Sequence, residues 1–170
     1  MELEHAIRTR RTHKAYAPEP VDRATLDELF ELARWAPNHK LTNPWRFRVL
    51  GPIALERLKE ATGDLIAAAK LNRAPTLVLV SATQSGDPLM DEEDVLAAAT
   101  AAYVVLLAAH GRGLAGYWRT PGVLRTRAGR AALGVPDDEH VLGLLHLGHP
   151  RQEARVPERA PVEAVVSYLD

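Results

Sequence analysis

The sequence contains no cysteine. Disulfide bonds, thiolate catalysis, zinc–thiolate sites and iron–sulfur clusters are therefore all excluded. Charge of either sign is not in excess, because 21 Lys and Arg residues balance 22 Asp and Glu residues and the formal net charge is −1. This balance argues against broad electrostatic binding of nucleic acid, which needs a surplus of basic residues on one face.

Several common site motifs are also missing. The chain has no G-x-x-x-x-G-K phosphate loop, no G-x-G-x-x-G after a strand pattern and no G-x-S-x-G nucleophile elbow. Its seven histidines are scattered and form no H-x-x-x-H or H-E-x-x-H pattern, so we predict no metal site. What remains is chemistry supplied by an organic cofactor.

Long hydrophobic runs are absent as well. Residues 1–14 lack the apolar core of a signal peptide, and the apolar stretch 95–109 is shorter than the roughly 20 residues that span a bilayer. The 170 residues are 46% hydrophobic and 25% charged, which is typical of a soluble globular protein. We therefore expect a single cytoplasmic domain over residues 1–170.

The hydrophobic periodicity predicts an α+β fold with about four strands and five helices. Asp22 is a good N-cap for one helix, and the acidic residues 91–94 suit the start of a long central one. We expect helices over residues 3–8, 22–36, 53–71, 91–110 and 127–133. We expect strands over residues 47–50, 76–81, 114–118 and 141–147. The proline-containing segment 150–170 suggests an arm that lies along a surface and ends in a strand.

Three segments combine cations, hydroxyls and aromatic residues. They are Arg10-Arg11-Thr12 with His13 and Lys14, then residues 36–40 with 43–47, and then Gly116-Tyr117-Trp118-Arg119-Thr120. Guanidinium groups match phosphate geometry, and the neighbouring Thr hydroxyls add donors. Aromatic surface beside such donors suits a phosphorylated ring compound. Clustered arginines are also commonly solvated or paired with carboxylates, and 22 acidic residues are available here.

The order of four motifs resembles the nitroreductase family of FMN-dependent NAD(P)H oxidoreductases, and in particular its short bacterial branch. The motifs are Arg-Arg-Thr, then Ala-Pro-Asn-His-Lys with Asn-Pro-Trp-Arg-Phe, then Gly-Tyr-Trp-Arg-Thr, then Leu-Gly-His-Pro. The resemblance implies a nitroreductase-like three-layer α/β/α sandwich with a mostly antiparallel central sheet. It also implies a homodimer with an extended C-terminal arm and FMN at the subunit interface.

The resemblance further implies roles for single residues. Residues that would hold FMN from one subunit are Arg10, Arg11, Thr12, Trp118, Arg119 and Thr120, the last three at the phosphate end. Trp35 and His39 would approach the flavin from the partner subunit. Lys14, or alternatively Arg10, would take an electrostatic catalytic role near the flavin pyrimidine, where negative charge develops on reduction. The segment 108–113 would meet the nicotinamide nucleotide.

These assignments predict an enzyme that moves electrons from NAD(P)H to nitroaromatic or quinone-like acceptors by a ping-pong mechanism. Because larger members of the family insert a lid in this general region, the resemblance and the short loop 83–88 together imply an open pocket that accepts varied molecules. Two alternatives stay open. One is a non-catalytic FMN-binding or storage protein of the same fold, and the other is a cofactor-free interaction module whose arginines face a protein partner.

Overall fold

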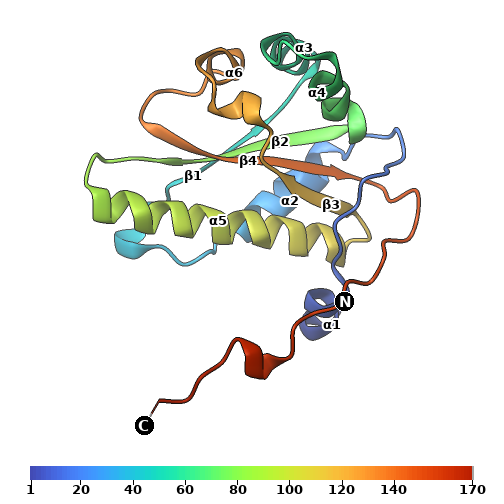
Figure 1. Cartoon of the computed structure of the whole chain (residues 1–170), viewed down its shortest axis with the longest axis vertical. Helices are drawn as coiled ribbons and strands as arrows, with labels where there is room; N and C mark the ends of the chain where they lie inside the picture. Colours follow the sequence, from blue (N-terminus) through green and yellow to red (C-terminus); the bar gives the residue numbers. More distant parts are fainter. Residues whose placement is uncertain (170) are drawn as a thin grey trace.

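A four-stranded antiparallel sheet forms the centre of the computed structural model, which describes residues 1–169 (Figure 1). Its strands lie in the order β1-β2-β4-β3. Their bounds are β1 Trp45–Val49, β2 Thr76–Thr83, β3 Ala115–Arg119 and β4 Glu139–Gly148. Strand β2 is buried on both faces and is a continuous apolar run, as a central strand should be. Strand β3 lies at one edge, which leaves half of its backbone groups free of the ladder.

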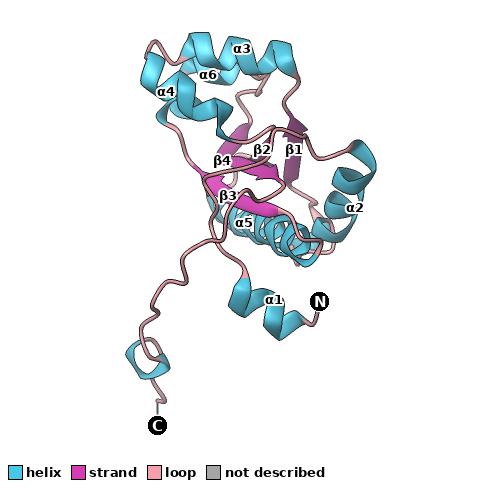
Figure 2. Ribbon diagram, turned by 90° about the vertical axis from the view of Figure 1, so that its right-hand side faces the viewer, coloured by secondary structure: helices cyan, strands magenta, loops and turns pink. Residues whose placement is uncertain are grey.

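Helices cover both faces of this sheet. Their bounds are α1 Leu3–Thr9, α2 Arg23–Ala33, α3 Pro52–Ala61, α4 Leu65–Ala69, α5 Pro88–Gly111 and α6 Arg127–Ala132. Figure 2 shows α5 and α2 against one face and α3, α4 and α6 over the other. Short 3₁₀ turns lie at His39–Leu41, Lys70–Arg73, Gly122–Arg125 and Val162–Ala164. The predicted α+β sandwich with an antiparallel sheet is confirmed.

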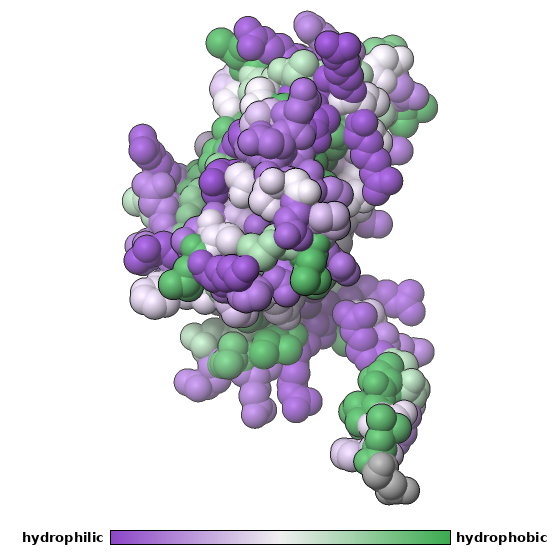
Figure 3. All heavy atoms as spheres, turned by 90° about the vertical axis from the view of Figure 1, so that its left-hand side faces the viewer, coloured by the Kyte–Doolittle hydropathy of each residue, from purple (hydrophilic) through white to green (hydrophobic). Residues whose placement is uncertain are grey.

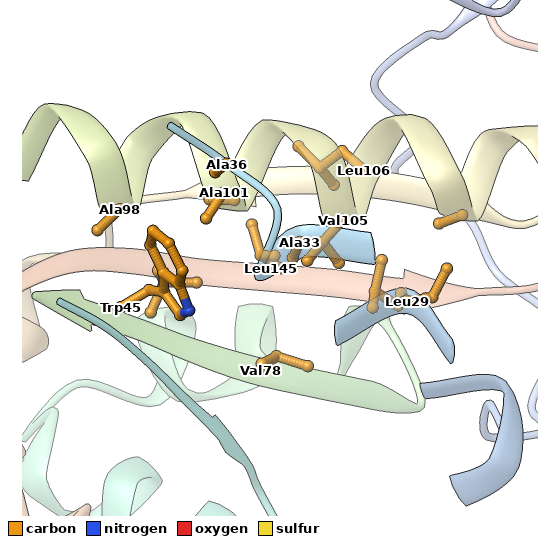
Figure 4. Close-up of a cluster of buried hydrophobic side chains, with 14 of the residues drawn as sticks. Leu29, Ala33, Ala36, Trp45, Val78, Ala98, Ala101, Val105, Leu106 and Leu145 are labelled. Atoms are coloured by element: carbon orange, nitrogen blue, oxygen red, sulfur yellow. The ribbon is translucent and has the colours of Figure 1, made fainter. Parts of the chain in front are cut away.

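Helix α5 packs closely on the sheet because small residues face it. The buried face of α5 is largely alanine, with Ala97, Ala98, Ala101, Ala102 and Ala109. These side chains meet Leu145 of β4 and the indole of Trp45 in one buried cluster (Figure 4). Alanine favours the helix, and its small volume lets the larger sheet side chains fill the space between the layers.

The ends of the helices follow local sequence signals. The Asp22 carboxylate accepts from the Thr25 N–H and caps α2, as predicted. Asp87 caps α5 in the same way, so this helix begins at Pro88, before the acidic run that was expected to start it. Thr126 caps α6, and Gly134 follows that helix with a φ of 61°.

The predicted single helix over residues 53–71 is wrong. Gly63 takes a φ of 60°, a left-handed conformation that ends α3, and Asp64 then caps the separate helix α4. The apolar periodicity of the predicted helix would turn Leu65 and Ile66 inward, but these side chains are 90% and 69% exposed. Two short helices therefore replace one, and the register of the apolar positions changes at the break.

The strand expected near the C-terminus is also absent from the described chain. Residues 151–169 form an extended arm whose single regular element is the turn Val162–Ala164. Figure 3 shows its apolar side chains projecting from the body of the molecule. Large apolar residues exposed there are Val162, Val165, Val166, Tyr168 and Leu169. An arm with this composition has no apolar surface of its own protomer to cover it.

The 24-residue helix α5 is longer than the apolar stretch identified in the sequence, and by length and composition alone it could cross a membrane. Its buried residues pack against the sheet instead, so it is the central helix of this fold. The cytoplasmic location stays a prediction.

His146 lies on the face of β4 that points away from α5, on the same side as Leu144 and opposite Leu77 of β2. Its side chain is fully buried, and neither ring nitrogen has a hydrogen-bond partner among the described residues. Burial, with Arg119 and Arg73 nearby, lowers the pKa of His146 to about 4. The imidazole is therefore neutral at pH 7, and His146 is a core residue rather than a metal ligand.

We expect the free energy of unfolding to fall as the pH decreases from about 6.5 to about 4, because the unfolded chain then binds a proton that folded His146 does not bind. At about 1.4 kcal/mol for each pKa unit, the full loss is about 3 kcal/mol. Urea denaturation over this pH range should show a flatter profile for His146→Leu. The matched control is His140→Gln, at an exposed position of the same strand. An unchanged slope in His146→Leu would rule out this histidine as the source.

Candidate functional site

The first and third sequence motifs meet at the open edge of the sheet. Thr12 forms a bridge with Gly116 of β3, and the His13 N–H donates to the Gly116 carbonyl at 3.2 Å. Residues more than 100 positions apart in the chain are thus joined along one edge. Because backbone groups alternate along a strand, the N–H and C=O of Trp118 face the same edge as those of Gly116.

A hollow beside this edge is lined by four arginines. Its volume is about 490 Å³, and its lining residues are Ile7, Arg8, Arg10, Arg11, Tyr103, Pro157 and Arg159. They come from α1, the segment after it, α5 and the C-terminal arm. None of the four guanidinium groups forms an ion pair with a carboxylate of residues 1–169. Such a concentration of positive charge favours an anion.

Two of these arginines are held in place by their surroundings. The Arg10 guanidinium lies over the Tyr103 ring at 5.7 Å from its centroid, a cation–π contact. Arg11 Nη1 donates to the Arg8 carbonyl at 2.6 Å and to the Arg10 carbonyl at 2.9 Å. Arg11 Nε is buried without a hydrogen-bond partner among residues 1–169. The arginine hollow therefore has ordered walls and one unsatisfied donor.

Two neutral histidines adjoin this basic region. Burial lowers the pKa of His110, with added repulsion from Arg10, and burial also lowers the pKa of His13. The Thr9 hydroxyl donates to the His5 carbonyl at 2.6 Å, so His110 Nε2 must donate to Thr9 Oγ1 at 2.8 Å. This bond fixes the end of α1 on the end of α5, within the segment 108–113 that was expected to meet the nicotinamide nucleotide.

The expected convergence of Arg119 with Arg10 is not found. Consecutive side chains of a strand point to opposite faces. Trp118 packs on the α5 side of the sheet, whereas Arg119 points to the other side and donates to the Lys70 carbonyl at 3.3 Å. The two guanidinium groups therefore lie on separate surfaces of the protomer. The pleat of β3 makes it impossible for Trp118 and Arg119 to face the same side.

The second motif forms a strained loop at the far end of α5. Three residues without the freedom of glycine have a positive φ: 52° at Lys40, 54° at Leu41 and 49° at Asn43. Each such conformation costs about 1–3 kcal/mol and must be held by the structure around it. Asn38 Oδ1 supplies part of this restraint by accepting from the Asn43 N–H at 2.9 Å.

Two acidic residues of α5 anchor the same loop. His39 Nδ1 lies 2.6 Å from Glu93 Oε2, and the Thr42 hydroxyl donates to Asp94 Oδ1 at 2.6 Å. The Asp94 side chain is buried, whereas His39 is exposed. Trp35 is 75% exposed and has the Arg34 guanidinium over its ring. Within one protomer, neither Trp35 nor His39 lines the arginine hollow.

The remaining predicted residues are accessible. Lys14 is exposed, and no hydrogen bond or ion pair holds its ammonium group within the described chain. Thr12 and Thr120 are exposed at the sheet edge and just beyond β3. Sequence reasoning missed Tyr103 and Arg159 as members of the arginine hollow. An isolated arginine in a proline-rich arm carries no local pattern, so only the folded chain places Arg159 beside Arg10.

Comparison with known families agrees with this architecture. The sequence profile described as "Nitroreductase family" matches residues 7–149. The chain belongs to the nitroreductase family. The matched range contains the first three sequence motifs and all but the last residue, Pro150, of the fourth, and the family predicted from them is confirmed. The classification as an oxidoreductase is confirmed with it.

Two relatives in this family match over most of their length. The Bacillus subtilis protein "Putative NAD(P)H nitroreductase YfhC" is 25% identical, covering 94% of this chain and 90% of the relative. An Archaeoglobus fulgidus protein, "Putative NADH dehydrogenase/NAD(P)H nitroreductase", is 26% identical, covering 86% and 84%.

Solved structures of nitroreductases share the fold. A nitroreductase-like family protein from Bacillus cereus matches with a TM-score of 0.91 at 20% identity, covering 100% of this chain and 97% of that one. The FMN- and NADPH-dependent nitroreductase NfnB from a Sphigopyxis strain matches with a TM-score of 0.84 at 20% identity, covering both chains fully. The nitroreductase sandwich is thus present here in full.

We expect Thr42→Val to lower the free energy of unfolding by about 1.5–3 kcal/mol, because the buried Asp94 carboxyl then loses the hydroxyl that donates to it. Thr42→Ser keeps the hydroxyl and should stay close to wild type. Thermal or urea denaturation of both variants measures the difference. Equal stability of the two variants would show that this bond does not restrain the strained loop.

Proposed function

We propose that this member of the nitroreductase family is an FMN-dependent oxidoreductase. It transfers electrons from NAD(P)H to nitroaromatic or quinone-like acceptors, and the two substrates occupy one site in turn. The names of its relatives support the nicotinamide donor, and the NfnB neighbour is described as FMN- and NADPH-dependent. When bound, FMN supplies the two-electron chemistry that the amino acids of the chain cannot supply.

The arginine hollow carries this proposal. The terminal phosphate of FMN is a compact dianion, and Arg8, Arg10, Arg11 and Arg159 surround the hollow without a carboxylate of the described chain to neutralise them. Charge-assisted bonds of this kind contribute about 1.5–3 kcal/mol each, so two or three contribute about 3–9 kcal/mol and the contacts of the flavin ring must supply the rest of the binding free energy. The residues present therefore fit the phosphate end of the cofactor.

The open edge of β3 suits the ring end of the flavin. This edge contains Thr12, Gly116 and Trp118. The backbone N–H of Trp118 points outward there and is free to donate to an acceptor on the flavin ring. Lys14 follows Thr12 and is exposed, so its ammonium group can stabilise negative charge on the pyrimidine. Trp118, which the resemblance placed at the phosphate end, is assigned here to the ring end through its backbone N–H, and Thr120 keeps a proposed contact through its hydroxyl. The side chain of Arg119 does not share the phosphate, because it faces the other side of the sheet.

The proposed site is completed by a second copy of the chain. Trp35 and His39 do not line the hollow of their own protomer, so we assign their proposed contacts, as the resemblance implies, to the flavin of the partner. Apolar residues exposed beside α1 and α2 include Leu3, Leu32 and Trp35, and the arm adds further apolar side chains. Contiguous apolar surface of this kind marks an interface. The extended arm would lie on the partner subunit, with its apolar side chains covered.

The two alternative functions differ in simple observables. A storage protein of this fold would bind FMN without oxidising NAD(P)H, and a cofactor-free interaction module would be colourless. The uncompensated arginines beside an open strand edge favour an anionic ring cofactor over a protein partner. The free Lys14 ammonium favours turnover over storage, because a cation at the pyrimidine stabilises the reduced state.

Purified protein reconstituted with FMN should oxidise NADH or NADPH in the presence of a quinone or a nitroaromatic compound. Because both substrates use one site, double-reciprocal plots at several fixed acceptor concentrations should give parallel lines. Stopped-flow reduction by the nicotinamide alone, without acceptor, should occur at a rate no slower than turnover. FMN binding without any nicotinamide oxidation would instead favour the storage function.

Arg10→Ala and Arg159→Ala should each weaken FMN binding by about tenfold or more, since each removes one charge-assisted bond to the phosphate. Arg119→Ala should leave the FMN dissociation constant within about threefold of wild type, because its guanidinium lies on the opposite face of the sheet. Quenching of flavin fluorescence on titration of the apoprotein gives the dissociation constants. Loss of FMN from Arg119→Ala with full retention by Arg10→Ala would overturn this placement of the phosphate.

A further inference from the structure

Strand β4 contains a bulge opposite the middle of β2. Val80 pairs with Gly143 and Ser81 pairs with Val141, so Leu142 is an extra residue on β4. A bulge leaves the backbone groups of the extra residue outside the regular ladder and re-aims the neighbouring side chains. The Leu142 carbonyl is used here, because it accepts from the Trp118 indole N–H at 3.3 Å.

Gly143 makes this contact possible. The Trp118 side chain starts opposite Leu145 and reaches diagonally across β4 to Leu142, so it passes directly over Gly143. A Cβ atom at position 143 would lie 2.6 Å from Trp118 Nε1 and 2.6 Å from the Arg119 carbonyl oxygen. The φ of Gly143 is 150°, a conformation that other residues rarely adopt. Both the space and the backbone at this position therefore require glycine.

The two atoms that exclude a side chain at Gly143 belong to Trp118 and Arg119, in the third sequence motif. The backbone of β3 at these residues is also the open edge that the ring end of the flavin is proposed to meet. The indole anchor holds the strand from the α5 side, and the Arg119 bond to Lys70 holds it from the other side. Movement of either residue would change the direction in which the backbone N–H of Trp118 points at the edge.

We infer that Gly143 is a positioning residue for the flavin site: by lacking a side chain, it lets the Trp118 indole bond to the bulged Leu142 carbonyl and so sets the β3 edge. This inference rests on the proposed function of that edge. It assigns no contact between Gly143 and the flavin. The expected consequence is that a methyl group at position 143, on the face of the sheet that packs against α5, disturbs a cofactor site at the open edge of β3.

The test compares Gly143→Ala with Gly63→Ala. Gly63 also has a positive φ, of 60°, but a Cβ there would meet no atom within 4 Å. Gly63→Ala therefore controls for backbone strain without a steric clash. Each protein is labelled with 5-fluorotryptophan, and Trp118→Phe assigns the fluorine resonance of Trp118. The fluorine spectrum of the apoprotein and the FMN dissociation constant of each variant are then measured.

In Gly143→Ala we expect the Trp118 resonance to shift and FMN to bind about tenfold more weakly, the loss that follows when one hydrogen bond at the ring is misaligned. Gly63→Ala should keep both properties, and the resonances of Trp35 and Trp45 should stay in place in either variant. In a Trp118→Phe background, where no indole lies over position 143, the effect of Gly143→Ala on FMN affinity should shrink. An unshifted Trp118 resonance or a fully additive double variant would overturn the inference.

If Gly143→Ala does not fold, Trp118→Phe alone decides. Wild-type FMN affinity in that variant would overturn the inference, because the affinity would then not depend on the indole that Gly143 accommodates. Weaker binding would support it. Failure of the proposed function is distinguishable from both outcomes: wild-type protein would then not bind FMN, while the fluorine spectrum of the apoprotein would still report the effect of Gly143 on Trp118.

Discussion

The packing of α5 on the sheet fixes the position of every segment of the candidate site. Alanines on its buried face bring the helix close to β4 and β2, and this close contact leaves little freedom for either layer. Near its start, Glu93 and Asp94 hold the strained loop through His39 and Thr42. Near its end, Tyr103 and His110 hold Arg10 and the end of α1. One rigid helix thus sets the separation between the second motif and the first.

The pleat of β3 is a second constraint, and it shows why sequence proximity misleads in a strand. Trp118, Arg119 and Thr120 form one motif in the sequence, and a guanidinium beside a hydroxyl suits a phosphate. In the folded chain the middle residue faces the opposite side, where its neighbours are His146 and the carbonyl of Lys70. The proposed phosphate donors that replace it are Arg8 and, in the arm, Arg159, which no local pattern connects.

The parts of the fold that depend on local patterns could be predicted from the sequence. The Asp22 cap, the apolar run of β2 and the central helix each follow from a few adjacent residues. The helix over residues 53–71 could not be placed well, because one glycine in a left-handed conformation outweighs an apolar periodicity that continues past it. The arm was expected to end in a strand because it is apolar, but its apolar residues have no pairing partner within the protomer.

The length of α5 also bears on why the proposed site needs two subunits. Glu93 and His110 are 17 residues apart on one helix, which at 1.5 Å per residue separates the His39 loop from the end of α1 by about 25 Å. A single flavin in the arginine hollow cannot bridge that separation. A two-fold axis that crosses α5 would place the His39 loop of one subunit near the α1 end of the other, and would do so twice. The same rigid helix that separates the motifs within a protomer would then bring them together across the interface.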